Sequence, residues 1–237
     1  MSYCADLPAD STIRRILIVK WSAMGDLIIA TALFEDIVRA FPDREIHLDT
    51  QPAWQPLFAH DRRFQKVLTV DWRDRRRRLH QMGTWLRQVW AGNYDLAIDL
   101  QCNDRSRLLL SLLWLGGRRI RYRLGNRRQF PYNIAPTEPP PPVHAFIRGR
   151  AALQAGGIPT TTPRPVLHIP ARTRARVREL LERHGLQANR RAGLPPSSGG
   201  AGAHRVDRRS GRTRRVSDYR PAMRLMAGRS VRANRNS

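Results

Sequence analysis

Lysine, cysteine and long apolar runs are all scarce in this sequence of 237 residues. Lys20 and Lys66 are the only lysines, against 41 arginines. Cys4 and Cys102 are the only cysteines, and their wide separation excludes a disulfide framework and a cysteine-based metal or redox motif, which fits a reducing cytoplasm. The longest apolar run, residues 108–115, is far shorter than the ~18 residues that span a bilayer. The acidic N-terminus has no apolar segment of a secretory signal. We therefore expect a soluble or peripheral protein.

Several well-known active-site motifs are also missing. Neither lysine follows a glycine, so there is no P-loop, and no G-x-G-x-x-G follows the first predicted strand. The histidines lack H-E-x-x-H or Cys/His ligand spacing, and there is no G-x-S-x-G nucleophile elbow. The sequence therefore predicts neither a metal site nor a bound cofactor, and gives no support for hydrolase chemistry.

Acidic residues are few, and the excess of positive charge is unevenly distributed. The net charge is +24, of which +11 lies in residues 188–237 and +13 in the preceding 187 residues. Such charge fits an acidic partner: nucleic acid, an anionic lipid surface or a phosphorylated substrate. Residues 188–237 lack large apolar residues and periodicity, so we expect a disordered Arg-rich tail. Its single aromatic residue, Tyr219, argues against base stacking and hence against nucleic acid as the partner.

The first 187 residues alternate between apolar strand patterns and helix patterns. A hydrophobic fraction of 41% is enough for a core, and nearly continuous apolar strands favour a parallel α/β sheet covered on both faces. The strand order cannot be read from the sequence. We expect strands at residues 14–20, 45–49, 66–70, 94–100, 119–123 and 165–170, and helices at residues 27–40, 79–90, 104–114, 144–154 and 173–184.

The segment Lys20–Asp26 joins the first predicted strand to the first predicted helix. Gly25 would let the backbone approach a ligand closely, and the helix N-terminus favours an anion. Asp26 would lie at the carboxyl edge of the sheet, where open α/β sheets bind ligands, and could act as a general base. Residue type alone leaves an alternative open, in which Asp26 or Ser22 simply caps the helix.

A second polar turn, Asp99–Ser106, follows a later strand in the same way. Arg105 could hold a phosphate or carboxylate bidentately, although an arginine on a solvated helical turn is an equally good interpretation. The run Asp71–Arg78 contains five arginines. It could be a solvated surface or could dock on anionic lipid headgroups.

Taken together, these segments resemble glycosyltransferase family 9, the ADP-heptose:lipopolysaccharide heptosyltransferases. The resemblance covers residues 13–187. It rests on segments in a fairly specific order and spacing: Ile16–Lys20 with Ser22, Gly25 and Asp26; Ala40–Asp43; Pro52–Trp54 with Pro56–Leu57; Tyr94–Gln101 with Arg105–Ser106; and His144–Ile158.

The resemblance implies a GT-B architecture, in which two Rossmann-like domains face each other across a cleft. The N-terminal domain would receive a lipid-linked sugar acceptor and the C-terminal domain a nucleotide-sugar donor, ADP-heptose, for an inverting, metal-independent transfer. Asp26 matches the family's catalytic base, which shifts the balance from helix cap to base. The other residues that match positions near the acceptor are Lys20, Ser22, Gly25, Arg105 and Ser106.

The sequence departs from the family after Gln187, where no Gly-rich donor-binding half follows. We expect residues 1–165 to form the acceptor domain, 166–187 a linker or the start of a second domain, and 188–237 the tail, a frameshifted or truncated C-terminus. The family would place the protein in the cytoplasm, in peripheral contact with the inner membrane. The alternative is a non-catalytic basic protein that binds nucleic acid or anionic membrane through its Arg-rich segments.

Overall fold

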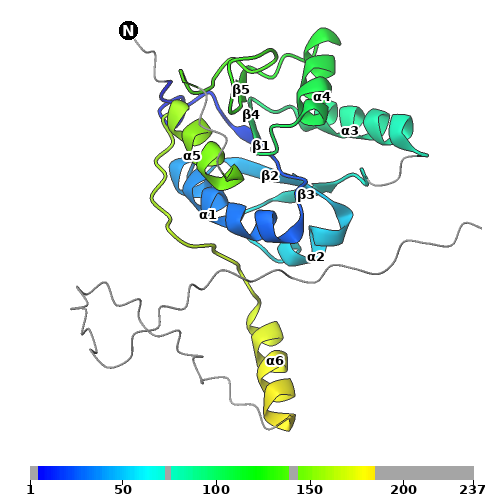
Figure 1. Cartoon of the computed structure of the whole chain (residues 1–237), viewed down its shortest axis with the longest axis vertical. Helices are drawn as coiled ribbons and strands as arrows, with labels where there is room; N and C mark the ends of the chain where they lie inside the picture. Colours follow the sequence, from blue (N-terminus) through cyan, green and yellow to red (C-terminus); the bar gives the residue numbers. More distant parts are fainter. Residues whose placement is uncertain (1–4, 73–75, 139–143, 185–237) are drawn as a thin grey trace, which may run out of the picture. The chain divides into compact units, whose positions relative to one another are not determined.

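The computed structural model describes residues 5–72, 76–138 and 144–184. Within these residues, five parallel strands form one sheet in the order β3-β2-β1-β4-β5, with β1 at its centre (Figure 1). The strands are β1 (Arg15–Val19), β2 (Glu45–Thr50), β3 (Lys66–Thr69), β4 (Leu96–Asp99) and β5 (Tyr122–Leu124). The predicted α/β class with a Rossmann-like parallel sheet is therefore confirmed.

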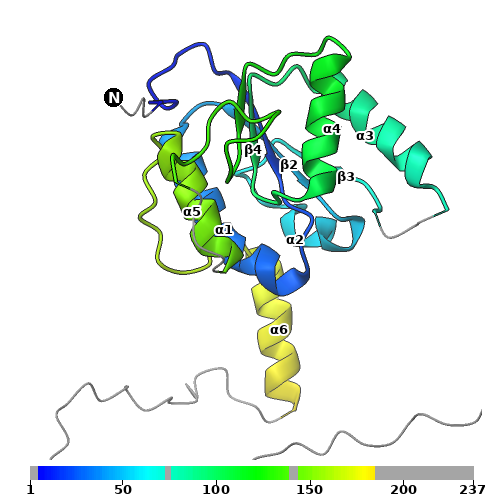
Figure 2. The same cartoon turned by 45° about the horizontal axis from the view of Figure 1, so that its top comes forward.

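Helices cover both faces of this sheet. Helices α1 and α5 lie on one face and α3 and α4 on the other (Figures 1 and 2). The helices are α1 (Met24–Ala40), η1 (Pro52–Trp54), α2 (Gln55–Phe58), α3 (Arg78–Gly92), α4 (Asp104–Leu115), α5 (Ala145–Ala155) and α6 (Ala171–Arg183).

The central strand β1 supplies both hydrophobic cores because its side chains alternate between the two faces. Ile16 and Ile18 pack in the larger core with residues of α1 and α5. Leu17 and Val19 pack in the second core with residues of α3 and α4. All four side chains are completely buried. Because both faces of β1 are buried along residues 16–19, each of these positions needs an apolar side chain, which explains the continuous apolar run in the sequence.

The sequence prediction fails in four places. The first helix begins at Met24 rather than at residue 27, so residues 24–26, predicted as part of the turn, belong to α1. Residues 165–170 form no strand, because Val166 donates its N–H to Thr31 Oγ1 and accepts from Arg63 at its carbonyl, so side chains satisfy its backbone groups. The last strand begins at Tyr122 rather than at residue 119, since Tyr122 N–H makes the first bond to the backbone of Asp95. The short helices η1 and α2 were not predicted, and each has a proline in its first turn.

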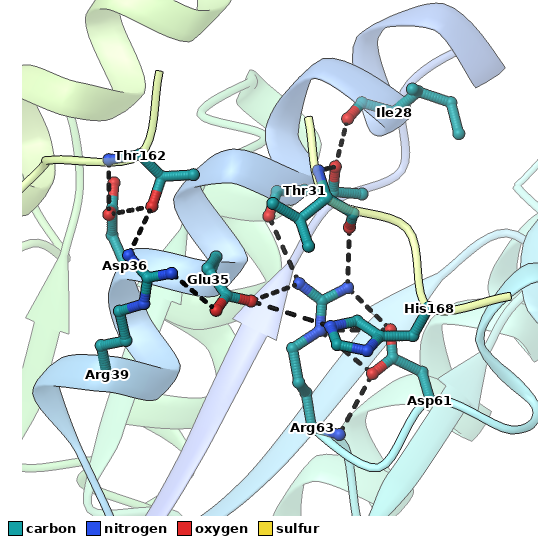
Figure 3. Close-up of polar contacts among 10 residues, drawn as sticks. Ile28, Thr31, Glu35, Asp36, Arg39, Asp61, Arg63, Thr162 and His168 are labelled. Carbon is teal, nitrogen blue, oxygen red and sulfur yellow. Dashed lines mark hydrogen bonds and ion pairs between the residues drawn. The ribbon is translucent and has the colours of Figure 1, made fainter. Parts of the chain in front are cut away.

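A buried polar cluster, here called the polar clamp, fixes residues 161–166 against α1 (Figure 3). Asp36 Oδ1 accepts hydrogen bonds from Thr162 N at 3.0 Å and Thr162 Oγ1 at 2.6 Å. Arg63 binds Asp61 with its Nη2 at 2.7 Å, Glu35 with its Nη1 at 3.1 Å, and the carbonyl of Val166 with Nη2 at 3.1 Å. The clamp consists of Thr31, Glu35, Asp36, Asp61 and Arg63.

Beyond the clamp the chain continues into α6, none of whose described residues is buried. Among the described helices, none has both the length and the apolar character needed to cross a membrane. The predicted domain boundaries at residues 165 and 187 stay predictions. The predicted disordered tail, residues 188–237, lies outside the described residues.

Candidate active site

The two polar turns singled out in the sequence meet at one edge of the sheet. In the register of the central strands, Val19 of β1 lies opposite Asp49 of β2 on one side and Asp99 of β4 on the other. Because the strands are parallel, the residues that follow all three emerge at the same carboxyl edge. Lys20–Asp26 and Asp99–Ser106 therefore become neighbours, although about 80 residues separate them in the sequence.

Three side chains hold the turn between β1 and α1. Gln101 Oε1 accepts from the backbone N–H of Trp21 and from Ser22 Oγ, both at 3.0 Å. Trp54 Nε1 donates to the carbonyl of Ser22 at 3.1 Å, and Gln51 donates to the carbonyl of Trp21. This turn is thus fixed by residues from two other strand ends, a role that the sequence did not reveal.

Lys20 is a buried cation behind this turn. Only 4% of it is exposed, and its Nζ donates to the carbonyl of Leu100 at 3.1 Å. Burial lowers the pKa of Lys20, while the negative charges of Asp26 and Asp99 oppose that shift. Lys20 therefore ties the ends of β1 and β4 together and carries positive charge toward Asp26.

Asp26 lies in the first turn of α1, because the helix begins two residues earlier, at Met24. The N-cap residue is Ala23, and no side chain in the described part of the chain makes a capping hydrogen bond there. The alternative in which Asp26 or Ser22 caps the helix is therefore wrong. The exposed carboxylate is stabilised by the positive end of the helix dipole and is accessible to a ligand.

Gly25 lies next to Asp26 on the exposed start of α1. A Cβ atom built at this position meets no described atom within 4 Å, and the backbone is not left-handed. Packing and conformation in the described chain therefore give no reason for a glycine here. What its missing side chain provides is an open approach to the backbone beside Asp26.

In the second polar turn, Asn103 and Ser106 form a capping box at the start of α4. Asn103 Oδ1 accepts from Ser106 N at 2.9 Å, and Ser106 Oγ accepts from Asn103 N at 3.2 Å. Ser106 is completely buried. Its hydroxyl is occupied by the start of the helix, so the geometry favours a structural role, and substrate contact by Ser106 stays a prediction.

Arg105 faces an open pocket of about 570 Å³ beside α4. Its guanidinium lies 5.3 Å from the centre of the Trp72 ring, a cation–π contact. Burial, and then the nearby charge of Arg78, lower the pKa of Arg105. The pocket is lined by Trp72, Arg78, Met82, Asn103, Asp104, Arg105, Leu108 and Leu109. An aromatic face beside two guanidinium groups suits a ligand with both an apolar ring face and a negative charge.

The site brings together Lys20, Ser22, Gly25 and Asp26 at the junction of β1 and α1, and places Arg105 and Ser106 at the start of α4, which follows the neighbouring strand β4. Sequence reasoning missed Trp72, Gln51 and the roles of Trp54 and Gln101. Trp54 and Gln101 lie in segments that resemble the family, and this resemblance was the sequence signal that could have indicated their roles. Among the described residues there is no group of three or more side chains that could hold a metal ion.

Comparison with solved structures gives two relevant matches. The glycosyltransferase family 9 protein from Veillonella parvula matches with a TM-score of 0.63 and 21% identity, over 78% of this chain and 52% of that one. The ADP-heptose lipopolysaccharide heptosyltransferase II of E. coli matches with a TM-score of 0.52 and 16% identity, over 73% of this chain and 51% of that one. The likeness shows the fold.

This chain therefore has the fold of one half of a GT-B glycosyltransferase structure and spans about half the length of the structures it matches. No family model and no curated protein sequence matches it.

Proposed function

We propose that this chain is the acceptor-binding half of a family 9 glycosyltransferase, which transfers heptose from ADP-heptose to a lipid-linked sugar of the lipopolysaccharide core. One observation carries the proposal: the carboxylate of Asp26 is exposed, makes no capping hydrogen bond to α1, and lies at the carboxyl edge of the parallel sheet. The likeness to family 9 structures supports it.

In this proposal Asp26 is the catalytic base. Its carboxylate takes the proton from the attacking acceptor hydroxyl. The acceptor oxygen then forms a bond to the anomeric carbon of the donor sugar while the bond from that carbon to the ADP oxygen breaks, and ADP leaves with the electron pair. A single displacement of this kind inverts the configuration at the anomeric carbon.

The other residues bind and orient the acceptor. Ser22 and the open backbone at Gly25 border Asp26, and the buried cation Lys20 lies behind them, tied to the end of β4. Arg105 beside Trp72 would hold a phosphate or carboxylate of the acceptor. We assign the ADP-heptose site to the second half that the matched structures contain.

The acceptor is lipid-linked, so this proposal includes peripheral contact with the cytoplasmic face of the inner membrane. Arg78 and Arg105 line the same pocket and give this edge of the sheet a positive charge. Anionic headgroups near the acceptor would be attracted to such a surface.

The test measures binding of the chain to vesicles that contain heptose-free lipopolysaccharide core, to anionic vesicles without it and to neutral vesicles. We expect the tightest binding to the acceptor vesicles, and affinity within about threefold of that value for Asp26→Asn, because the amide keeps the shape of the base. Any heptose transfer from ADP-heptose, followed by mass spectrometry, should fall by at least about 10²-fold in Asp26→Asn.

The control variant is Asp43→Asn, which changes an exposed carboxylate beyond the other end of α1 and should alter neither binding nor transfer. Equal binding to all three vesicles would contradict the acceptor assignment. Transfer that survives in Asp26→Asn would contradict the assignment of the base.

A further inference from the structure

Two buried polar atoms without partners lie just behind the turn that carries Ser22 and Asp26. Within the described chain, Asp49 Oδ1 and Trp21 Nε1 are both buried and have no hydrogen-bond partner. The other oxygen of the same carboxyl group, Asp49 Oδ2, accepts from Trp85 Nε1. Asp49 is 0% exposed and belongs to the face of the sheet that α3 and α4 cover, since it pairs with Val19.

The two indole rings belong to one aromatic cluster against this carboxyl group. The ring centres of Trp21 and Trp85 lie 6.1 Å apart in an edge-to-face arrangement, and Trp72 lies 4.9 Å from Trp21. Burial raises the pKa of Asp49, and the indole N–H of Trp21, like that of Trp85, lies close enough to oppose this shift, although Trp21 forms no hydrogen bond to Asp49 in this structure. Asp49 therefore faces two donors, of which the structure pairs one.

Hydrogen-bond chemistry decides which form of Asp49 can satisfy both donors. A carboxylate only accepts, and each of its oxygens can take one indole N–H. In a neutral carboxyl group one oxygen carries a proton, which makes it the weaker acceptor and adds a donor for which neither indole offers an acceptor. With Oδ2 already bonded to Trp85, a proton on Oδ1 would compete with the indole N–H of Trp21 for this oxygen. The ionised form therefore suits two indole bonds better than the neutral form.

We propose that Asp49 is a positioning residue for the candidate active site: in its ionised form it binds the indole N–H groups of Trp21 and Trp85 together and so fixes the turn that carries Ser22 and Asp26. The backbone of Trp21 is already held by Gln101. Anchoring its indole as well would remove the remaining rotation of this residue. This inference depends on the contacts of Trp21 and Asp49 and not on the reaction that the site performs.

The surroundings of Asp49 place its ionisation near neutral pH. Burial raises the pKa of Asp49 to about 7, the two indole N–H groups lower it, and the charge of Asp99 on β4 raises it. Tyr94, just before β4, has a raised pKa and bonds to His47 on β2. The neighbour of Asp49 on β3, Leu68, and its bonded partner on α3, Trp85, are both uncharged. Asp49 should therefore bind both indole N–H groups, an interaction here called the anchor, as the pH rises through about 7.

Intrinsic tryptophan fluorescence between pH 5 and 9 tests this inference on the full chain. We expect a sigmoidal change with its midpoint near 7, which disappears in Asp49→Asn because the amide does not ionise. Trp21→Phe should lose most of the amplitude. His47→Gln should keep the transition, which separates Asp49 from the nearby histidine.

A second measurement needs no variant: the side-chain carboxyl carbon of Asp49, labelled with ¹³C, should titrate near 7 in the wild-type chain. A ¹³C chemical shift of the Asp49 carboxyl carbon that does not change over this pH range would overturn the inference. So would a fluorescence transition that is unchanged in Asp49→Asn. Acceptor binding at pH 6 and pH 8 separates it from the proposed function. A fluorescence transition in a chain that binds no acceptor supports the anchor and contradicts the acceptor role.

Discussion

At the scale of single residues, the candidate site depends on groups whose surroundings differ sharply over a few positions. Lys20 is buried, Ser22 is held by Gln101, and Asp26 is exposed, although all three lie at the junction of β1 and α1. The sequence predicts Lys20, Ser22 and Asp26 because they follow an apolar strand. It could not predict Asp49 or Gln51, because their partners, Trp85 and Trp21, come from distant segments.

Gly25→Ala separates stability from binding at this site. The added methyl group meets no described atom and favours the helix, so we expect the free energy of unfolding to rise by about 0.5 kcal/mol. Acceptor binding should weaken at least about tenfold if a ligand approaches this backbone, since one methyl group of overlap can cost 1–3 kcal/mol. Urea unfolding and vesicle binding measure the two effects.

The matched control is Gly83→Ala in α3, where an added Cβ also meets open space. It should raise stability by a similar amount and leave binding unchanged. Unchanged binding in Gly25→Ala would show that no ligand contacts this turn closely.

At the scale of elements, strands and helices could be predicted where burial alone defines them, and could not where side chains replace backbone partners. The apolar runs of β1 and β4 predict their strands well. Residues 165–170 have a similar apolar pattern between two prolines, yet the polar clamp satisfies Val166 without a neighbouring strand. Strand order was not predictable, because it depends on pairings far apart in the sequence.

Removing the central cation of the polar clamp should release residues 161–166. Arg63→Met leaves Asp61, Glu35 and the carbonyl of Val166 without their shared partner. Because breaking a buried ion pair strands the remaining charge, we expect a loss of about 3–5 kcal/mol in the free energy of unfolding. Hydrogen exchange at residues 161–166 should become faster.

The neighbouring exposed arginine gives the control for this prediction. Arg62→Met removes the same charge from the surface and should change stability by less than about 0.5 kcal/mol. Equal effects of the two substitutions, or unchanged exchange at residues 161–166 in Arg63→Met, would contradict the clamp.

At the scale of the whole molecule, most of the charged residues are arginines, whereas a few buried ionisable groups control the pH dependence of stability. Burial raises the pKa of Asp49 to about 7 and that of Asp99 above its usual range. Burial lowers the pKa of His47. The composition of the chain indicates its large net charge, but only the fold shows which acids are buried.

Asp49 should make the folded chain less stable as pH rises from about 4 to about 7. In this window the folded state keeps a proton on Asp49 that the unfolded state, with a pKa of 3.8, has released. Each pH unit should therefore remove about 1.4 kcal/mol of the stability that protonated Asp49 contributes. His47 has the opposite sign, because its lowered pKa adds stability as pH rises toward 6.5.

Comparison with Asp49→Asn isolates this contribution, because His47 and Asp99 are common to both chains. The difference in the free energy of unfolding between wild type and Asp49→Asn, from urea titrations at pH 5, 6 and 7, should fall steadily with pH. A difference that stays constant over this range would show that Asp49 ionises alike in the folded and unfolded chains.

Helix α1 has a mechanical consequence, because it carries both Asp26 and the clamp residue Asp36. Ten residues of α-helix span about 15 Å, and the buried face of α1 packs along the sheet without a break. The helix therefore sets a fixed spacing between the contact with residues 161–166 and the exposed carboxylate of Asp26.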